Sequence, residues 1–286
     1  MDLQEDHQSQ DPALLSGDPK AESVSSEQST SLKQLFSQLH QGTLSLQRVH
    51  NLWLLLVCEY SILDLSRPRD RYYAFAGIAD IFNRIVKDEC LAGIWKNDIA
   101  RGLCWTGSPC SSPIHSRSLI APTWSWMSRV HESRGQFGSS TRYHISTDNF
   151  MRDERLIISH SAPGSYFSFG LSKDNILDIT AVVIPAPISI FSSRSDYYKF
   201  HISLQSLTPT IRLDADCPGP SGDDLRHGDE CFCLLLGRNF IHDCVVVLRK
   251  CRDSEGEFFN RIGITQFDCH EYSQFEDAEV RRLSVI

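Results

Sequence analysis

The sequence lacks an apolar run long enough to cross a membrane. Its longest apolar tract within the first strong helical pattern, Leu52–Cys58, is far shorter than the roughly 20 residues that a spanning helix needs. Acidic residues at positions 2, 5 and 6 stand where a secretory signal would carry positive charge before an apolar stretch. We therefore expect a soluble chain with no signal peptide and no membrane partner.

An excess of positive charge is also missing. The formal net charge is −8 at pH 7. Nucleic acids and anionic membranes are bound through basic surfaces that release counterions, so this acidic chain is a poor candidate for either. We expect its partners to be proteins or small molecules.

The ten cysteines do not have the density of a disulfide scaffold in a chain of 286 residues. Most lie in apolar runs, as reduced core thiols do. Cys231 and Cys233 would share one face of a strand at roughly 7 Å, beyond ordinary disulfide reach. This pattern favours a reducing, cytoplasmic location.

What the chain does contain is ample material for a core, with 41% apolar and 10% aromatic residues. Residues 1–31 are polar and acidic, and we expect a disordered tail there. Residues 32–130 predict a helical cluster that ends in a Trp-Ser-Trp strand, and residues 131–286 predict a β-rich region. The expected fold class is α+β, with an N-terminal helical cluster followed by an antiparallel sheet or small barrel.

Three helices are predicted after two short helical pieces that break at Gly42. The first, at about 48–65, presents Trp53 and Tyr60 on one face. The second, at about 70–86, starts at Asp70, which is placed to cap it, and carries Ala74, Ile78, Ile81, Phe82 and Ile85 on one stripe. It contains Gly77, which we expect to permit close approach of another helix or of an aromatic ring, with Trp53 and Trp95 as the nearest candidates. The third, at about 94–103, carries Trp95. Asp70 and Arg71 could alternatively belong to a buried ion-pair network, although capping is the simpler account.

Beyond residue 140 the apolar pattern has a period of two, which is typical of strands. We predict strands at 176–184, closed by Pro185 and Pro187, and at 211–215, 231–236, 244–248 and 283–286. A hairpin should join 245–248 to 258–267 through a glycine-containing loop. After Pro122, Trp124 and Trp126 should point to one face of a strand and Ser125 to the other.

No motif in the sequence carries a recognisable chemistry. Gly102–Ser108 has phosphate-loop glycine spacing but no lysine, Ser168 lacks the first glycine of a nucleophile elbow, and Asp214–Gly219 has a proline at a calcium-ligand position. His242, Cys244, Cys251, Cys269 and His270 lack the paired spacing of zinc sites. We expect no metal and no cofactor. For the tryptophans, core packing is favoured over an aromatic platform for a ligand.

Five segments, taken in order, do resemble a known series. They are Trp53 to Tyr60-Ser61, Asp70-Arg71 to Gly77-Ile78-Ala79, Leu91-Ala-Gly-Ile-Trp95, Leu103-Cys-Trp105 and Ala121-Pro-Thr-Trp-Ser-Trp126. This series resembles the C-terminal part of fungal heterokaryon-incompatibility (HET) domain proteins over residues 45–130. The signatures of the N-terminal HET core, which is likened to NAD-cleaving signalling domains, are not found in the 286 residues.

The resemblance implies a role in fungal non-self recognition and programmed cell death. Because activity would reside in the absent core, it implies a non-enzymatic interaction or regulatory module, either a truncated paralogue or the partner of a separate HET-core protein. The alternative is a small cytosolic hydrolase with an unrecognised Cys or Ser nucleophile, since catalytic partners can lie far apart in a chain. The two differ in what they predict: an exposed apolar patch for the module, or a convergent nucleophile and base for the hydrolase.

Overall fold

The computed structural model describes residues 31–63, 70–107, 121–129, 141–143, 149–161, 175–192, 198–202, 210–213, 225–240, 242–251, 256–268 and 275–286. Its helices are α1 (Leu32–His40), α2 (Leu46–Ser61), α3 (Asp70–Val86) and α4 (Ile99–Gly102), with 3-10 turns η1 (Lys96–Asp98) and η2 (Trp126–Arg129). The predicted tail at 1–31 lies outside the described residues except for Ser31.

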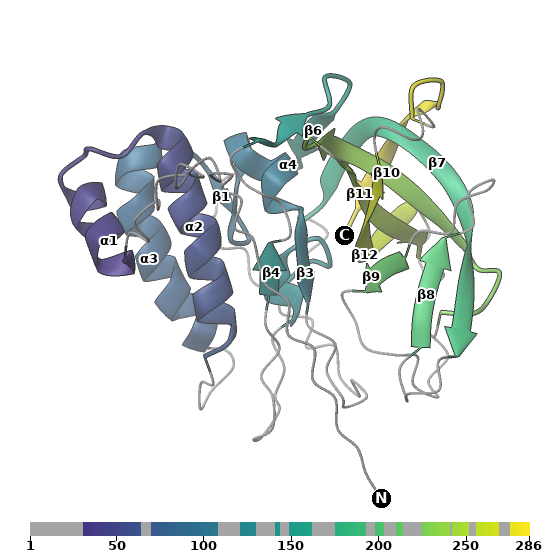
Figure 1. Cartoon of the computed structure of the whole chain (residues 1–286), viewed down its shortest axis with the longest axis horizontal. Coiled ribbons are helices and arrows are strands. Elements are labelled where there is room, and N and C mark those ends of the chain that lie inside the picture. Colours follow the sequence, from purple (N-terminus) through teal and green to yellow (C-terminus); the bar gives the residue numbers. More distant parts are fainter. Residues whose placement is uncertain are drawn as a thin grey trace, which may run out of the picture.

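Most strands follow the helices in the chain, which confirms the α+β class. They are β1 (Cys90–Leu91), β2 (Ile94–Trp95), β3 (Trp105–Gly107), β4 (Thr141–Tyr143), β5 (Met151–Arg152), β6 (Ile157–His160), β7 (Leu177–Ser192), β8 (Tyr198–Ile202), β9 (Thr210–Leu213), β10 (Glu230–Arg238), β11 (His242–Lys250), β12 (Phe258–Asp268) and β13 (Val280–Val285). Figure 1 shows α1, α2 and α3 side by side, β3 and β4 in the middle, and the large curved sheet at the other end.

The first two helices begin at serine caps. The Ser31 hydroxyl accepts a hydrogen bond from the Gln34 amide, and the Gln34 side chain accepts one in return from the Ser31 amide at 2.9 Å. Ser45 caps α2 in a similar way through the Arg48 amide. Between the helices Gly42 has a φ of 67°, a left-handed conformation that suits glycine. The predicted break at Gly42 is confirmed.

The second predicted helix exists as α3, but its buried face is not the predicted one. We expected an inward row of Ala74, Ile78, Ile81, Phe82 and Ile85. Of this row Phe82 is fully buried, and Phe75 and Ala79 complete the buried face. The apolar residues of α3 span an arc wider than one contact needs, and the rings of Phe75 and Phe82 both pack on Trp53. The aromatic residues therefore decide which part of the arc is buried.

The third predicted helix is wrong over most of its length. Ile94 and Trp95 form β2, which pairs antiparallel with β1, and the α-helix is confined to Ile99–Gly102. Ala92 and Gly93 both have positive φ, 43° and 86°, so they form the tight turn that folds β2 back on β1. The apolar spacing that suggested a helix therefore belongs to a hairpin followed by a short helical turn.

The predicted Trp-Ser-Trp strand is also wrong. The Ser125 amide donates to Pro122 O, and the Ser128 amide donates to Ser125 O, both at 3.0 Å. These local bonds make a turn that runs into η2, so Trp124, Ser125 and Trp126 are all buried instead of alternating. Because the backbone of this segment forms hydrogen bonds within its own turn, it needs no partner strand.

The large sheet closes on itself. In the described residues β7 pairs with β8, β8 with β9, β9 with β12, β12 with β11, β11 with β10, and β10 with β7 again. The strand β13 adds a second closure because it pairs with β7 antiparallel and with β12 over a short parallel stretch. We expected an antiparallel sheet or a small barrel, and the closed pairing corresponds to the barrel, in which the β12–β13 pairing is parallel. The predicted β11–β12 hairpin is confirmed.

Two prolines lie inside β7 and do not end it, which corrects the predicted boundary at residue 184. The Ile188 amide donates to Asp229 O beside β10, whereas the Val183 amide donates to Glu279 O on the opposite edge. Amides of odd-numbered residues here therefore point away from β10. Pro185 and Pro187 occupy odd positions, so the N–H that each proline lacks would not have pointed to β10, and the pairing with β10 loses no hydrogen bond. On the opposite edge they lie between the stretch that pairs with β13 and the stretch that pairs with β8.

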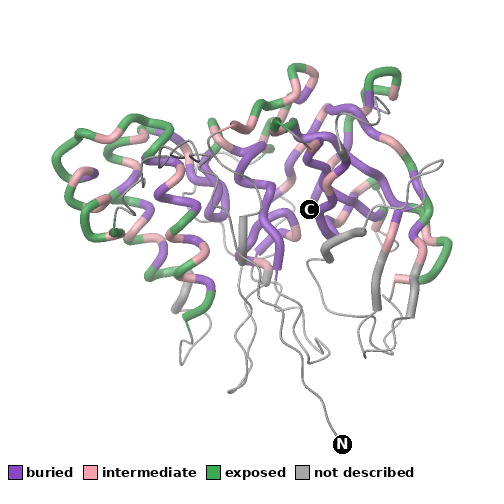
Figure 2. The backbone as a smooth tube through the Cα atoms, viewed as in Figure 1, coloured by how far each residue is buried: buried purple, intermediate pink, exposed green. Residues whose placement is uncertain are grey.

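The two faces of the sheet form two cores. One face packs with the helices into a single cluster that includes all five tryptophans, which we name the junction core. The other face forms the sheet core, built mainly of aliphatic residues and cysteines of β7, β8, β10 and β11. Figure 2 shows buried backbone concentrated between the helices and the sheet. Within the described residues no helix has the length and apolarity to span a membrane.

Candidate functional site

The β1–β2 turn is the point where distant segments of the chain converge. Its two residues, Ala92 and Gly93, expose their carbonyl groups to the junction core. Ala92 O accepts a hydrogen bond from the Ser125 hydroxyl at 2.6 Å. Gly93 O accepts two, from the indole N–H groups of Trp53 and Trp126, each at 3.1 Å. The turn is thus held by α2 on one side and by Ser125 and the first residue of η2 on the other.

Close packing explains the glycine in this turn. A Cβ at Gly93 would lie 2.7 Å from Trp126 Nε1 and 2.9 Å from Met127 Cε, closer than real Cβ contacts. The Ser125 hydroxyl also accepts from the Met127 amide at 3.0 Å, which fixes the segment that approaches the turn. The Leu91-Ala-Gly-Ile-Trp95 and Trp-Ser-Trp segments are therefore two halves of one contact.

The other tryptophans extend this contact toward the sheet. Trp105 donates its indole N–H to Trp124 O, and Trp124 donates to Asn175 O just before β7, each at 3.0 Å. Arg261 of β12 donates to the carbonyl oxygens of Leu103 and Trp105, and its guanidinium carbon lies 3.8 Å from the centre of the Trp105 ring. One buried cation therefore joins the sheet to the segment that follows α4.

The ring faces are used for packing. Trp53 lies with its ring centre 4.8 Å from that of Phe75 and 5.0 Å from that of Trp95, and Phe75 lies 5.0 Å from both Tyr60 and Trp126. Each tryptophan is at most 2% exposed. A ring buried to this extent presents no face to a ligand, so the core-packing interpretation of the tryptophans is confirmed.

Three of the predicted motif residues do not join this cluster. Asp70 is the first residue of α3, and the side chains of Asp70 and Arg71 lie outside the described ones, so the capping prediction stays a prediction. Gly77 is exposed, and a Cβ there would meet no atom within 4 Å. The expected approach of a tryptophan ring to Gly77 is wrong. In this cluster the glycines in close contact are Gly93 and Gly102, and a Cβ at Gly102 would lie 2.3 Å from Ile94 Cγ2.

A buried polar cluster beside the tryptophans was not predicted. Arg101, 3% exposed, donates to both carboxylate oxygens of Asp98, at 2.9 Å from Nε to Oδ1 and 2.7 Å from Nη2 to Oδ2. Its Nη1 donates to Asn51 Oδ1 of α2 at 2.7 Å. The spacing of three residues between Asp98 and Arg101 was a visible signal, but the contact with Asn51 spans fifty residues and no local pattern indicates it.

His50 completes this polar cluster. Its Nδ1 lies 3.9 Å from Asp98 Oδ2, and its buried Nε2 has no hydrogen-bond partner among the described residues. Burial lowers the pKa of His50 below its ordinary value, with the Arg101 charge acting in the same direction and the Asp98 and Asp88 charges opposing it. The imidazole is therefore neutral near pH 7, and a histidine beside a carboxylate is the kind of pair that a catalytic base requires.

The thiols near this region have the opposite character from nucleophiles. Burial raises the pKa of Cys90 to about 12 and that of Cys104 well above its ordinary value, where the neighbouring Cys244 adds to the effect. Nucleophilic cysteines need a lowered pKa. Of the predicted metal-site alternatives, Cys269 and His270 lie outside the described residues, and among the described ones no cluster of three or more His, Cys, Asp or Glu side chains could hold a metal.

Comparisons with known proteins identify no relative: no protein-family model, no curated protein and no solved structure matches this chain. The geometry alone therefore defines the site. It is a network of buried aromatic rings and hydrogen bonds that fixes the helices to the sheet, with one polar cluster at its margin.

Proposed function

We propose that the chain is a non-enzymatic protein-interaction or regulatory module, connected with fungal non-self recognition and programmed cell death, that binds a separate HET-core protein in the cytoplasm. The observation that supports it is an exposed apolar surface formed by Leu55, in the C-terminal half of α2, and by Ile62 and Leu63, the two residues that follow the helix. These side chains are 50%, 51% and 48% exposed. We name them the α2 patch.

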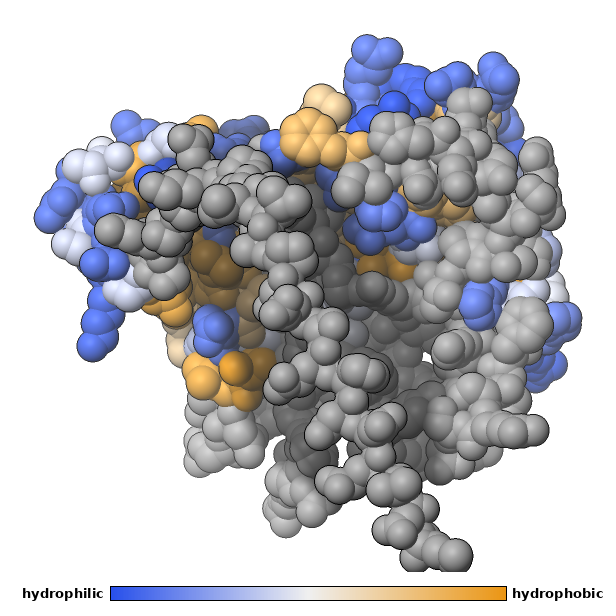
Figure 3. Space-filling view, viewed as in Figure 1, coloured by the Kyte–Doolittle hydropathy of each residue, from blue (hydrophilic) through white to orange (hydrophobic). Residues whose placement is uncertain are grey.

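The α2 patch has the physical properties of a docking surface. Leu55 and Ile62 are seven residues apart, so they lie on one line of the helix, opposite the side where Trp53 and Val57 are buried. Figure 3 shows hydrophobic side chains gathered over the lower part of α2. Burying a leucine or isoleucine side chain completely contributes about 1.5–3 kcal/mol of free energy. Covering three half-exposed ones would therefore contribute substantially to the free energy of binding.

Charge defines the kind of partner. Glu59 is exposed on α2 between Leu55 and Ile62, and the chain as a whole carries a formal charge of −8. A complementary partner surface is apolar at its centre with basic side chains at its rim. The resemblance of residues 45–130 to the rear part of HET proteins makes a protein that carries the missing HET core the partner we propose.

The hydrolase alternative has one favourable observation, the pair of His50 and Asp98. Against it, His50 is 6% exposed, and the pKa values of Cys90 and Cys104 are raised, which holds both as thiols at neutral pH. The interaction module is therefore the better supported function.

The test is binding between the full chain and a purified HET-core protein, measured by isothermal titration calorimetry. We expect Leu55→Glu and Ile62→Glu to weaken binding by at least about tenfold, because each places a charge in the apolar contact. Ile157→Glu, on the exposed side of β6, is the matched control and should leave binding unchanged. Equal weakening by all three changes would contradict the α2 patch.

A second experiment separates the two functions. The full chain is incubated with fluorophosphonate and iodoacetamide probes, which label activated serine and cysteine side chains. The interaction module predicts labelling no faster than that of the unfolded chain. Rapid labelling of one residue, abolished by His50→Gln, would instead favour the hydrolase.

A further inference from the structure

The helix α3 carries a second apolar row beside the one that it buries. The buried row contains Phe75, Ala79 and Phe82. The second row contains Ala74, Ile78, Ile81 and Ile85, at successive spacings of four, three and four residues, which place side chains in one line on a helix. Ala74, Ile81 and Ile85 are exposed, and Ile78 is half-buried. The fold buries this row only in part, although the spacing of its apolar residues is that of a helix–helix contact.

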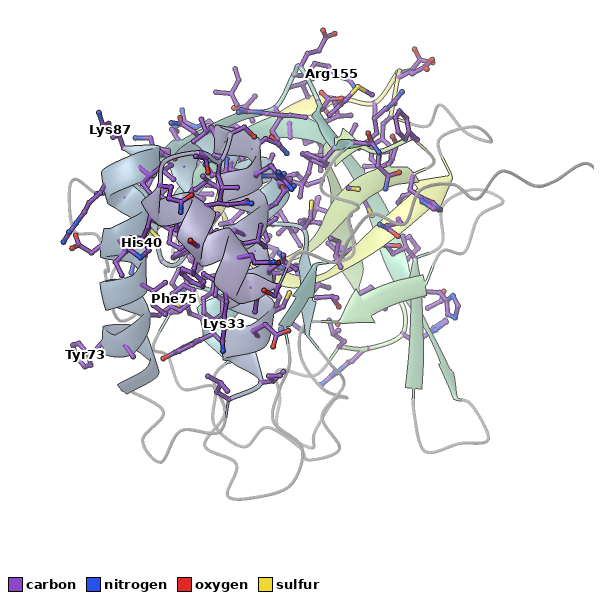
Figure 4. All side chains as sticks on the ribbon, turned by 60° about the vertical axis from the view of Figure 1, so that its left-hand side comes forward. Lys33, His40, Tyr73, Phe75, Lys87 and Arg155 are labelled. Carbon is purple, nitrogen blue, oxygen red and sulfur yellow. The ribbon has the colours of Figure 1, made fainter. Side chains whose placement is uncertain are left out.

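Space beside this row is open. A Cβ at Gly77 would meet no atom within 4 Å. Figure 4 shows Tyr73 and Lys87 extending outward from α3 near its two ends, whereas Phe75 lies on the side that faces α1 and α2. Nothing in the described part of the chain therefore prevents a second helix from lying along α3.

The charges at the edge of the row are arranged to complement a second copy of the same helix. Asp80 and Arg84 are both exposed and pair with each other at 3.1 Å. In an antiparallel pair of α3 helices with a two-fold axis between Ile81 and Phe82, Asp80 of one copy faces Asn83 of the other and lies one residue from its Arg84, and the converse holds. The same axis places Ile78 opposite Ile85 and the two Ile81 side chains together. The row is therefore self-complementary in its apolar pattern, and its flanking charges lie close to the opposite charges of the second copy, as an isologous interface requires.

We propose that α3 is a self-association surface through which two copies of this chain pair antiparallel. The contact is one 17-residue helix from each copy. A stable specific interface buries about 1,200–2,000 Å² in total, and a single helix pair falls short of that size, so the dimer is weak and depends on concentration. This inference goes beyond the proposed function, because it uses α3 and a second copy in place of the α2 patch and a HET-core partner.

Sedimentation equilibrium of the full chain from micromolar to millimolar concentration tests the proposal. The mean mass should rise from monomer toward dimer. Ile81→Glu should raise the dissociation constant by at least about tenfold, since two copies of the new charge would meet at the axis. Ile157→Glu, on the exposed side of β6, is the control and should not change it. A constant monomer mass, or equal self-association of Ile81→Glu and the unmodified chain, would overturn the proposal.

A charge exchange tests the register. Asp80→Arg alone places like charges beside Arg84 of the second copy and should weaken the dimer. The double change of Asp80→Arg with Arg84→Asp restores both the pair within α3 and the pair between copies, so it should restore the dimer. Circular dichroism shows whether each variant keeps its helix content. Failure of the double variant to recover, with helix content intact, would contradict the antiparallel arrangement.

Discussion

The two cores of this protein are held together in different ways. The sheet core is filled by side chains such as Val245, Val247 and Ile202, which contribute mainly by their volume. The junction core adds directed bonds: five buried tryptophans, four of which donate their indole N–H to backbone carbonyls, and a buried arginine over a ring. A core that depends on volume tolerates changes of shape, whereas one that depends on directed bonds fails when a single partner is lost.

The largest effect should come from Arg261, which joins the two regions. Arg261→Met removes the donors to Leu103 O and Trp105 O and the cation above the Trp105 ring. Each buried carbonyl without a donor costs about 1–3 kcal/mol and the cation–π contact adds about 2, so the loss is about 4–8 kcal/mol. Urea unfolding followed by tryptophan fluorescence would measure it. A loss below about 1 kcal/mol would show that the halves do not depend on this side chain.

A smaller loss is expected from Gly93→Ala, which alters the turn at the centre of the junction core. The left-handed φ of 86° and the close contacts with Trp126 and Met127 should together cost about 2–6 kcal/mol. The matched control is Gly77→Ala, in an exposed part of α3 with open space around it, which should stabilise the protein by about 0.5–1 kcal/mol. Thermal unfolding of both variants gives the comparison. Similar melting temperatures would contradict the role of the turn.

Ser125→Ala and Ile202→Val compare the two cores directly. Both remove one heavy atom from a fully buried side chain. Ser125→Ala leaves Ala92 O and the Met127 amide without their partner, at about 1–3 kcal/mol, whereas Ile202→Val removes one methyl group at about 0.5–1.5 kcal/mol. Denaturant unfolding should rank the serine change as the more costly. The opposite ranking would mean that volume governs both cores.

The same difference explains which parts of the fold the sequence could predict. Continuous apolar runs in β10 and β11 place buried side chains on both faces of the sheet, so these strands and the β11–β12 hairpin were predictable from local pattern. The hairpin of β1 and β2 was not, because Ala92 adopts a positive φ that alanine rarely takes. The turn is held by Ser125, which donates to Ala92 O, and by Trp126, which donates to Gly93 O, each more than thirty residues away. The presence of Pro185 and Pro187 inside β7 was likewise not predictable, because it depends on which edge of the strand their backbone nitrogens face.

For the candidate site, sequence pattern identified the residues but not their contacts. The tryptophans were expected in a core and are buried there. Gly77 was expected to be a point of close approach because a glycine inside a helix pattern is unusual, yet the close approach is at Gly93. An added Cβ there would meet Trp126, and the Gly93 carbonyl accepts from both Trp53 and Trp126. Hydrogen bonds across forty residues leave no periodic signal.

The smallest effect near neutral pH is expected at His50, and it should grow on acidification. Its folded-state pKa is lowered, mainly by burial, so between that pKa and about 6.5 the unfolded chain binds more protons than the folded one. Stability from this group is therefore fully present above pH 6.5 and is lost as pH falls toward the folded pKa. The charged groups that act on its pKa are Asp98, Arg101 and Asp88. His50→Gln should flatten the dependence of the unfolding free energy on pH between 7 and 5, measured by urea unfolding at each pH, while His242→Gln on β11 serves as the control. An unchanged slope in His50→Gln would show that the polar cluster does not couple proton binding to the junction core.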